Sequence, residues 1–200
     1  MKKILETIKS RKLLSTITIL TLIAAIFGIL FISLLSKENK ELIINSITNF
    51  FSVIKNNQVN YPTTLFKSIT NNLLLNLIIW LLGISIIGLP IVLIILSFDS
   101  FITSFTFTSI LYTYKLKGIL PAIIYIFPHL INLLTIFILT YYSASFSLTL
   151  FNFLFRKKEC NRKIIITRYL KLLLLSIIIS IISGLIETYL IPIFIKMFKL

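Results

Sequence analysis

The sequence predicts an all-α, polytopic membrane helix bundle of about five transmembrane helices, one of them short or re-entrant. Apolar residues make up 58% of the 200-residue chain, charged residues only 13%, and the mean hydropathy is +1.03. Average soluble domains contain roughly 45–50% apolar and about 25% charged residues. A water-soluble protein of this composition has too few polar residues to cover its surface. The composition therefore excludes a soluble enzyme and a disordered chain, and it indicates a single integral membrane domain over residues 1–200.

The first expected span covers residues 13–35, because about 20 mainly apolar residues cross the hydrocarbon core of a bilayer. A basic N-terminus, residues 1–12, precedes it. A secretory signal peptide also begins with basic residues, but its apolar core is shorter and ends in a small-residue cleavage site. Here the apolar stretch continues to Leu34 and Leu35, so a retained membrane anchor is favoured.

Residues 36–72 form the longest polar segment, which we expect to be extracytoplasmic and amphipathic. Apolar residues recur within it at helical spacing: Ile43, Ile47, Phe50, Phe51 and Ile54. Such a helix lies flat in the membrane interface, contacts a partner helix, or packs on its own bundle. We expect it to end before Tyr61 and Pro62.

Later spans are expected at residues 73–96, 100–114, 119–155 and 170–195. The first of these contains Gly83, Gly88 and Pro90, which membranes tolerate where neighbouring helices satisfy the freed backbone groups. The stretch 100–114 is short, so it either spans the membrane or re-enters it. The stretch 119–155 is too long for one crossing, and its second half is a helical extension or a partial second pass.

The basic residues predict the orientation of the chain in the cell membrane. They cluster in residues 1–12 and in residues 156–171, and cytoplasmic segments of membrane proteins are enriched in Lys and Arg. Both clusters, including a basic loop at 156–169, are therefore expected in the cytoplasm, separated by an even number of crossings. Five spans result, with the C-terminus outside. If 100–114 is re-entrant, 119–155 crosses twice and the total stays five.

The basic clusters flank apolar spans, which predicts attraction to anionic lipid headgroups rather than to nucleic acid.

Cys160 is the single cysteine, so an internal disulfide and a cysteine-based zinc site are excluded. Glu38 and Glu41 lie three residues apart on one predicted helix, which suits surface charges better than a glycosidase pair. We therefore predict no catalytic residue, metal, cofactor or small-molecule substrate, and no enzyme activity.

Few ionisable residues lie at membrane depth. Asp99 separates two apolar stretches and is expected at a membrane interface. Glu187 lies about two turns before the last apolar stretch ends, where a charge costs on the order of 2.5–3.5 kcal/mol. It should be protonated, hydrogen-bonded or facing a polar cavity, with Asn76 and His129 as candidate partners. A structural interhelical hydrogen bond and a proton or ion relay both remain open.

Three local patterns of the sequence carry a resemblance to a known family. The first is the spacing N-x6-G-x4-G-x-P, carried by Asn76, Gly83, Gly88 and Pro90. The second runs from Lys117-Gly118-Ile119-Leu120 to Phe127-Pro128-His129. The third is the closing stretch GLIETYLIP, which contains Glu187 and Pro192. Together these patterns resemble the stage II sporulation protein M family of multispan membrane proteins. Family members typically have Gly and an acidic residue after Pro-His, whereas Leu130 follows here.

The resemblance implies a non-catalytic subunit of the engulfment machinery in endospore-forming bacteria, anchoring partner peptidoglycan hydrolases at the septum. Other membrane proteins, and septal peptidoglycan hydrolases among its partners, are therefore expected. A bundle with few internal polar groups and small loops suits lateral helix packing. The alternative is a small polytopic transporter or permease component that uses Glu187, Asn76, Asp99 and the interrupted second span.

Overall fold

A computed structural model describes the backbone of residues 2–156 and 162–197, and the side chains of residues 11–151 and 166–197. Within these ranges the chain is helical apart from short turns, which confirms the predicted all-α class. The elements are α1 (Lys2–Leu34), α2 (Lys37–Lys55), α3 (Tyr61–Gly83), α4 (Gly88–Tyr114), the 3-10 turn η1 (Lys115–Gly118), α5 (Ile119–Arg156), α6 (Arg162–Leu185), the π-helical turn η2 (Ile186–Leu190) and α7 (Ile191–Lys196).

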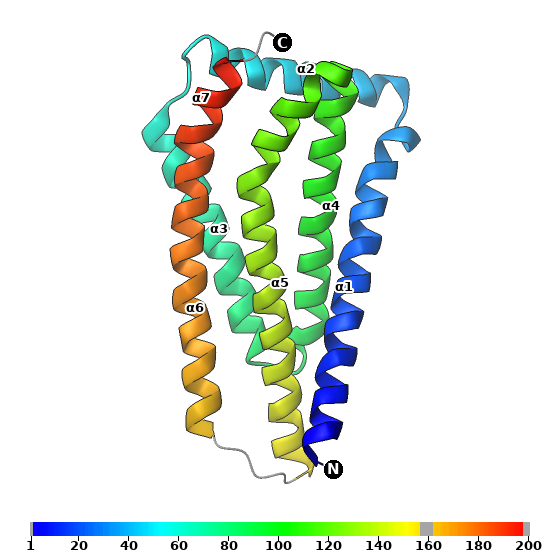
Figure 1. The fold of residues 1–200 in the computed structure, drawn as a ribbon, viewed down its shortest axis with the longest axis vertical. Helices are drawn as coiled ribbons and strands as arrows, with labels where there is room; N and C mark the ends of the chain where they lie inside the picture. The colour runs from blue at the N-terminus through cyan, green and yellow to red at the C-terminus, as the bar shows by residue number, and fades with distance from the viewer. Residues whose placement is uncertain (1, 157–161, 198–200) are drawn as a thin grey trace.

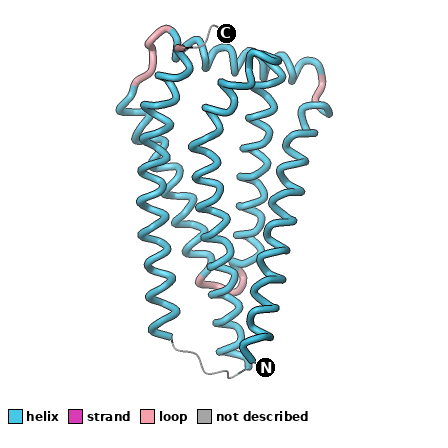
Figure 2. The backbone as a smooth tube through the Cα atoms, viewed as in Figure 1, coloured by secondary structure: helices cyan, strands magenta, loops and turns pink. Residues whose placement is uncertain are grey.

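Long helices form a bundle in the described part of the chain, and α2 lies across one end of it (Figure 1). The long helices α1, α3, α4, α5 and α6 run along the bundle in alternating directions, joined by short loops (Figure 2). We call the end that carries α2 the α2 end, and the opposite end, where α1 begins, the N-terminal end. Helix α1 begins at the N-terminal end, and α5 ends and α6 begins at the same end. The long helices α1, α3, α4 and α5, an even number, therefore separate the basic cluster at residues 1–12 from the one at residues 156–171.

Four apolar helical stretches in the described residues are long enough to cross a membrane: Arg11–Leu34, Tyr61–Gly83, Gly88–Phe151 and Ile166–Lys196. The third, with 64 residues, contains α4 and α5, which fold back on each other at η1. These four stretches therefore supply the five long helices of the bundle. Many of their large apolar side chains point outward, as expected for helices that face lipid.

The chain turns back at residues 84–87, which differs from the predicted spans. Residues 73–96 belong to α3 and α4 rather than to one interrupted span. The prediction that 100–114 is short or re-entrant is wrong, because these residues are the second half of the 27-residue helix α4. Helix α3 begins as early as Tyr61, since Asn60 caps its first turn and Pro62 fits there.

Helix α5 is continuous over 38 residues, so the second half of 119–155 is a helical extension. At about 1.5 Å per residue it is roughly 57 Å long, well beyond the hydrocarbon thickness of about 30 Å. It reaches further toward the N-terminal end than the α3–α4 turn does (Figure 1). Pro128 lies inside this helix and is buried.

Apolar side chains fill the centre of the bundle. The buried cluster comes from α1, α3, α4 and α5, and each member is at most 1% exposed: Ile17, Ile79, Val92, Leu96, Ile136 and Leu139. These side chains hold the long helices together through close packing.

Helix α2 uses its apolar stripe to pack on the end of its own bundle. Phe51 and Ile54 are only 2% and 3% exposed, and they form a second buried cluster with residues of α4, α5 and α7: Ile110, Ala122, Ile191 and Ile195. Phe50 remains 42% exposed. The opposite face of α2, which carries Glu38, Glu41 and Asn45, is exposed. Of the three roles that the sequence left open for this stripe, packing on its own bundle is the one observed.

Cys160 lies outside the described residues. The same holds for the side chains at positions 2, 3 and 9 and for most of the basic loop 156–169. Arg168 and Lys171 are described, and both side chains are exposed.

Candidate functional site

The residues singled out in the sequence gather at two interruptions of the helices. Gly83, Gly88 and Pro90 surround the α3–α4 turn, which lies toward the N-terminal end. Glu187 lies in η2 and Pro192 in α7, at the α2 end. Pro128 and His129 of α5 lie beside this second interruption, and Asn76 lies between the two interruptions on α3.

Gly83 lets α3, α5 and α6 meet closely before the α3–α4 turn. A Cβ atom on Gly83 would lie 2.2 Å from Tyr169 Oη and 2.4 Å from Ser143 Cβ. Tyr169 Oη donates a hydrogen bond to the Trp80 carbonyl at 2.7 Å and is 2.9 Å from Ser143 Oγ. In return, Trp80 Nε1 donates to the Tyr169 carbonyl at 3.1 Å, and the Trp80 and Phe146 rings both stack on Tyr169.

Gly88 and Ser85 close the turn itself. A Cβ atom on Gly88 would lie 2.0 Å from the carbonyl oxygen of Leu82, so a side chain has no room there. The Gly88 N–H donates to Ser85 Oγ at 2.8 Å, and Ser147 Oγ donates to the Ser85 carbonyl at 2.9 Å. Pro90 is in the first turn of α4, where a backbone N–H has no intrahelical partner. These residues therefore build a tight, internally hydrogen-bonded turn.

Asn76 connects α3 to α6 through a buried hydrogen bond. Its side chain is 1% exposed, and Nδ2 donates to Ser180 Oγ at 2.8 Å. The expected pairing of Asn76 with Glu187 is therefore wrong. Glu187 pairs with Ser68, which lies eight residues, or about 12 Å, earlier on α3.

Pro192 explains why the last helix widens into the π-helical turn η2. Proline has no N–H to donate, and its ring clashes with the carbonyl four residues earlier, here that of Thr188. The Ile191 N–H accordingly donates to the carbonyl of Ile186, five residues earlier. Such π-turns are rare and often occur at functional sites. The widened turn carries Glu187 and Thr188.

Glu187 links η2 to α3 and lies beside His129 of α5. Ser68 Oγ donates a hydrogen bond to Glu187 Oε2, and His129 Nε2 lies 3.9 Å from Glu187 Oε1, beyond hydrogen-bond distance. Helices α3 and α6 approach closely here because Gly184 has no side chain. A Cβ atom at Gly184 would lie 2.6 Å from Ile69 Cγ1. His129 is thus near Glu187 as predicted, whereas Ser68 is an additional partner.

Pro128 and His129 fix α5 against α6 beside η2. The Pro128 carbonyl accepts a hydrogen bond from Ser183 Oγ at 2.9 Å. The His129 ring centre lies 5.0 Å from that of Tyr125, one turn earlier on α5. Among the described residues, His129 Nε2 is buried and has no hydrogen-bond partner.

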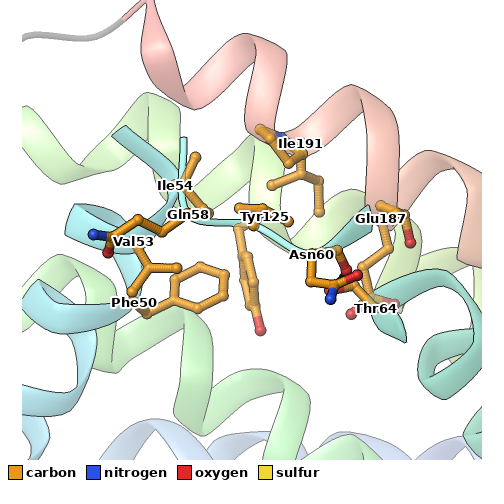
Figure 3. Close-up of a pocket in the computed structure, with 12 residues that line it drawn as sticks. Phe50, Val53, Ile54, Gln58, Asn60, Thr64, Tyr125, Glu187 and Ile191 are labelled. Atoms are coloured by element: carbon orange, nitrogen blue, oxygen red, sulfur yellow. Dashed lines mark hydrogen bonds between the residues drawn. The ribbon is translucent and has the colours of Figure 1, made fainter. Parts of the chain in front are cut away.

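A cavity of about 280 Å³ lies beside Glu187 at the α2 end. In Figure 3, Phe50 and Val53 lie at one side of it and Glu187 at the other, with Asn60 and Thr64 closer to Glu187. The lining residues come from α2, the α2–α3 loop, α3, α5, η2 and α7: Phe50, Val53, Ile54, Gln58, Val59, Asn60, Thr64, Tyr125, Glu187, Thr188, Ile191 and Pro192. Glu187 is the charged member of this lining.

Sequence reasoning missed Ser68, Tyr125 and Thr188. Ser68 is 119 residues from Glu187, and it lies in the polar segment interpreted as extracytoplasmic. The one available signal was Asn60-Tyr61-Pro62, a helix start that places Ser68 two turns into α3.

Asp99 lies in the middle of α4, so its expected place between two spans is wrong. The stretches on either side of it are the two halves of one helix. Its side chain is partly buried. Among the residues that the structure describes, α4 contributes none to the cavity lining, so Asp99 and Glu187 do not form one site.

The arrangement of Ser68, Glu187 and His129 differs from a hydrolytic triad. In a triad the serine bonds the imidazole, whereas here Ser68 donates directly to the carboxylate. Residues 11–151 and 166–197 hold no group of three His, Cys, Asp or Glu side chains placed to bind a metal ion. The site instead offers hydrogen-bond acceptors beside aromatic rings.

The sequence model of the family described as Stage II sporulation protein M matches residues 17–192. This range contains both helix interruptions, α2 and every residue that lines the cavity. Comparisons with curated proteins and with solved structures find no match. The family match confirms the resemblance carried by the three sequence patterns. The chain belongs to the stage II sporulation protein M family and is a membrane protein of this sporulation-related family.

Proposed function

We propose that the chain is a non-catalytic membrane scaffold that localises peptidoglycan hydrolases at the sporulation septum. The family match supports a sporulation-related role in the membrane. The observation that carries the scaffold role is the packed centre of the bundle, where Ile79, Leu96 and Ile136 are completely buried. A conduit for polar solutes requires a polar path through the bundle, whereas a scaffold requires a rigid body with surfaces for its partners.

Two surfaces of the bundle suit protein partners. Helix α1 leaves large apolar side chains uncovered, among them Leu22, Phe27 and Leu34, which are 58%, 62% and 77% exposed. Transmembrane helices of partners pack on such a surface through van der Waals contact. At the α2 end, the exposed polar face with Glu38, Glu41 and Asn45 suits a partner outside the lipid.

The proposed orientation places the N-terminal end in the cytoplasm and the α2 end outside. Basic residues at 1–12 and 156–171 support it, because cytoplasmic ends of spans are enriched in Lys and Arg. Near the N-terminal end, Arg168 lines a second cavity of about 150 Å³ together with hydroxyl-bearing residues such as Tyr142, Ser145 and Thr149. A positive charge beside hydroxyl groups suits the anionic lipid headgroups expected on the cytoplasmic side.

Single-cysteine labelling tests this orientation. In a Cys160→Ser background, we expect a membrane-impermeant maleimide to label Asn56→Cys, at the α2 end, in intact cells. The same reagent should label Ile87→Cys, in the α3–α4 turn, only after the membrane is permeabilised. Both positions are exposed in the bundle. Labelling of Ile87→Cys but not Asn56→Cys in intact cells would invert the proposed orientation.

Purification of the tagged full-length chain from sporulating cells tests the scaffold role. We expect peptidoglycan hydrolase activity, detected by zymogram, to copurify with the chain, and we expect a deletion strain to fail in engulfment. A triple variant of the α2 polar face, Glu38→Lys/Glu41→Lys/Asn45→Lys, should recover less hydrolase. The matched control, Lys115→Glu/Lys117→Glu, changes exposed charges in η1 at the same end. No hydrolase activity and normal engulfment in the deletion strain would contradict the scaffold.

The second candidate function, a transporter component, draws on Glu187 with Ser68 and His129 beside a cavity. An intramembrane carboxylate next to a cavity is typical of ion and proton pathways. Glu187→Gln separates the two functions. A transporter loses ion- or proton-coupled flux in liposomes through this substitution, whereas a scaffold keeps its hydrolase recovery and engulfment.

A further inference from the structure

The cavity at the α2 end presents hydrogen-bond acceptors that the protein itself does not satisfy. Glu187 Oε2 accepts a bond from Ser68, while Oε1 has no donor within hydrogen-bond distance among the described residues. Thr188 lines the cavity and is 0% exposed, and its Oγ1 has no partner in the described chain. Buried polar groups in proteins are nearly always paired, so Thr188 Oγ1 indicates a ligand or ordered water that pairs with it. The Glu187 side chain is 27% exposed, so Oε1 is accessible to the same partner.

The charge of the lining selects the kind of ligand. A carboxylate accepts several hydrogen bonds and donates none, and Glu187 is the one charged residue among those that line the cavity. His129 Nε2 is 3.9 Å from the carboxylate, and His129 is outside the lining. The cavity therefore favours a group that is positively charged and rich in donors.

The walls of the cavity favour the same group. Phe50 and Tyr125 meet edge to face with ring centres 5.4 Å apart, and both line the cavity. Aromatic rings attract cations, most strongly where water is excluded. Asn60, Gln58 and Thr64 add polar side chains that suit a hydroxyl or ester next to the cation. At about 280 Å³ the cavity has room for a small amine but not for a large solute.

We propose that this cavity binds a primary ammonium group, carried by a small amine or by the ethanolamine headgroup of a phospholipid. An ammonium group has three N–H donors, which suit Glu187 Oε1 and Thr188 Oγ1 together with a ring face. The cavity lies beside α2, at the end of the last apolar stretch Ile166–Lys196, where lipid headgroups are found. The proposal does not depend on the scaffold function, and its test uses binding rather than hydrolase recovery.

Ethanolamine and N-acetylethanolamine form a matched pair of probes, because acetylation removes the positive charge and two of the three N–H donors. We expect ethanolamine, at constant ionic strength, to raise the thermal unfolding midpoint of the detergent-solubilised full-length chain in a saturable way. N-acetylethanolamine should leave the midpoint unchanged. Glu187→Gln should weaken ethanolamine binding by about tenfold or more, because a charged hydrogen bond is lost. Glu41→Gln, an exposed carboxyl on α2, is the matched control and should bind as wild type.

Lipid nanodiscs distinguish the two sources of the ammonium group. If the ethanolamine headgroup fills the cavity, phosphatidylethanolamine discs raise the midpoint above phosphatidylcholine discs for wild type but not for Glu187→Gln. Free ethanolamine then adds nothing in phosphatidylethanolamine discs. If the ligand is a free amine, ethanolamine raises the midpoint equally in both lipids. Three results overturn the proposal: equal effects of ethanolamine and N-acetylethanolamine, equal ethanolamine binding by wild type and Glu187→Gln, or no response to ethanolamine in any medium.

Discussion

The two helix interruptions are built from similar residues but differ in how their polar groups are satisfied. At the α3–α4 turn, Ser85 pairs its hydroxyl with the Gly88 N–H and its carbonyl with Ser147, and Tyr169 bonds the Trp80 carbonyl. At η2, Thr188 Oγ1 remains without a partner in the described chain, and a cavity adjoins the turn. An interruption whose hydrogen-bonding groups are all paired has a structural role, and we call the α3–α4 turn the structural joint for this reason. An interruption with unpaired hydrogen-bond acceptors beside a cavity is suited to bind a ligand.

The largest effect in this comparison is expected from Gly88→Ala at the structural joint. The new Cβ atom would lie 2.0 Å from a backbone oxygen of Leu82, which cannot move without opening the turn. We expect the free energy of unfolding, measured by SDS titration, to fall by about 3 kcal/mol. Ile87→Ala, at a neighbouring side chain that is 82% exposed, should change it by less than about 0.5 kcal/mol. Equal stabilities of the two variants would show that the turn is not rigid.

Tyr169→Phe breaks the polar network of the same joint while keeping its aromatic stacking. Without the hydroxyl, the Trp80 carbonyl and Ser143 Oγ each lose a partner. We expect a loss of about 1–3 kcal/mol in the same titration, the usual effect of leaving a buried polar group unpaired. Tyr142→Phe, where the ring is 43% exposed, is the control and should have little effect. A loss below about 0.5 kcal/mol for Tyr169→Phe would indicate that stacking alone holds the joint.

The sequence predicted the helical class and the even number of helices between the basic clusters, because both depend on composition summed over long stretches. It misplaced the break between α3 and α4, since residues 73–96 are mainly apolar and contain no charged residue, and hydropathy does not distinguish a kink from a reversal. The reversal depends on contacts of Gly83 and Gly88 with Ser143 and Leu82, and the contact with Ser143 joins distant parts of the chain.

The candidate site was only partly predictable for the same reason. Glu187 stood out because an acidic residue near the end of an apolar stretch is costly in lipid. Its donor Ser68 is one of many serines and comes from a helix whose start was not recognised. The cavity requires α2 to fold over the end of the bundle through Phe51 and Ile54, which the amphipathic pattern left open.

A double-mutant cycle on Asn76 and Ser180 sharpens the contrast between the ends by measuring a hydrogen bond midway between them. Both side chains are buried and share a bond of 2.8 Å. We expect a coupling energy of about 0.6 kcal/mol between Asn76→Ala and Ser180→Ala, the average for hydrogen bonds inside membrane proteins. Coupling above about 2 kcal/mol would place a key stabilising contact in the middle of the bundle and weaken the contrast between its ends.

Thr188→Val is expected to have the smallest effect on the free energy of unfolding, and it distinguishes a ligand-binding site from a packing defect. Its hydroxyl is buried and has no hydrogen-bond partner among the described residues, so an isosteric apolar side chain should leave the free energy of unfolding unchanged or raise it by up to about 1 kcal/mol. Thr140→Val is a close control, because Thr140 is also 0% exposed, its Oγ1 also has no partner in the described part of the chain, and it lies outside the cavity. Both variants should behave alike without ligand, but Thr188→Val alone should reduce the stabilisation by ethanolamine. If both variants respond to ethanolamine as wild type does, the unpaired hydroxyl at η2 is a packing defect like that of Thr140. The two helix interruptions would then differ in packing but not in ligand binding.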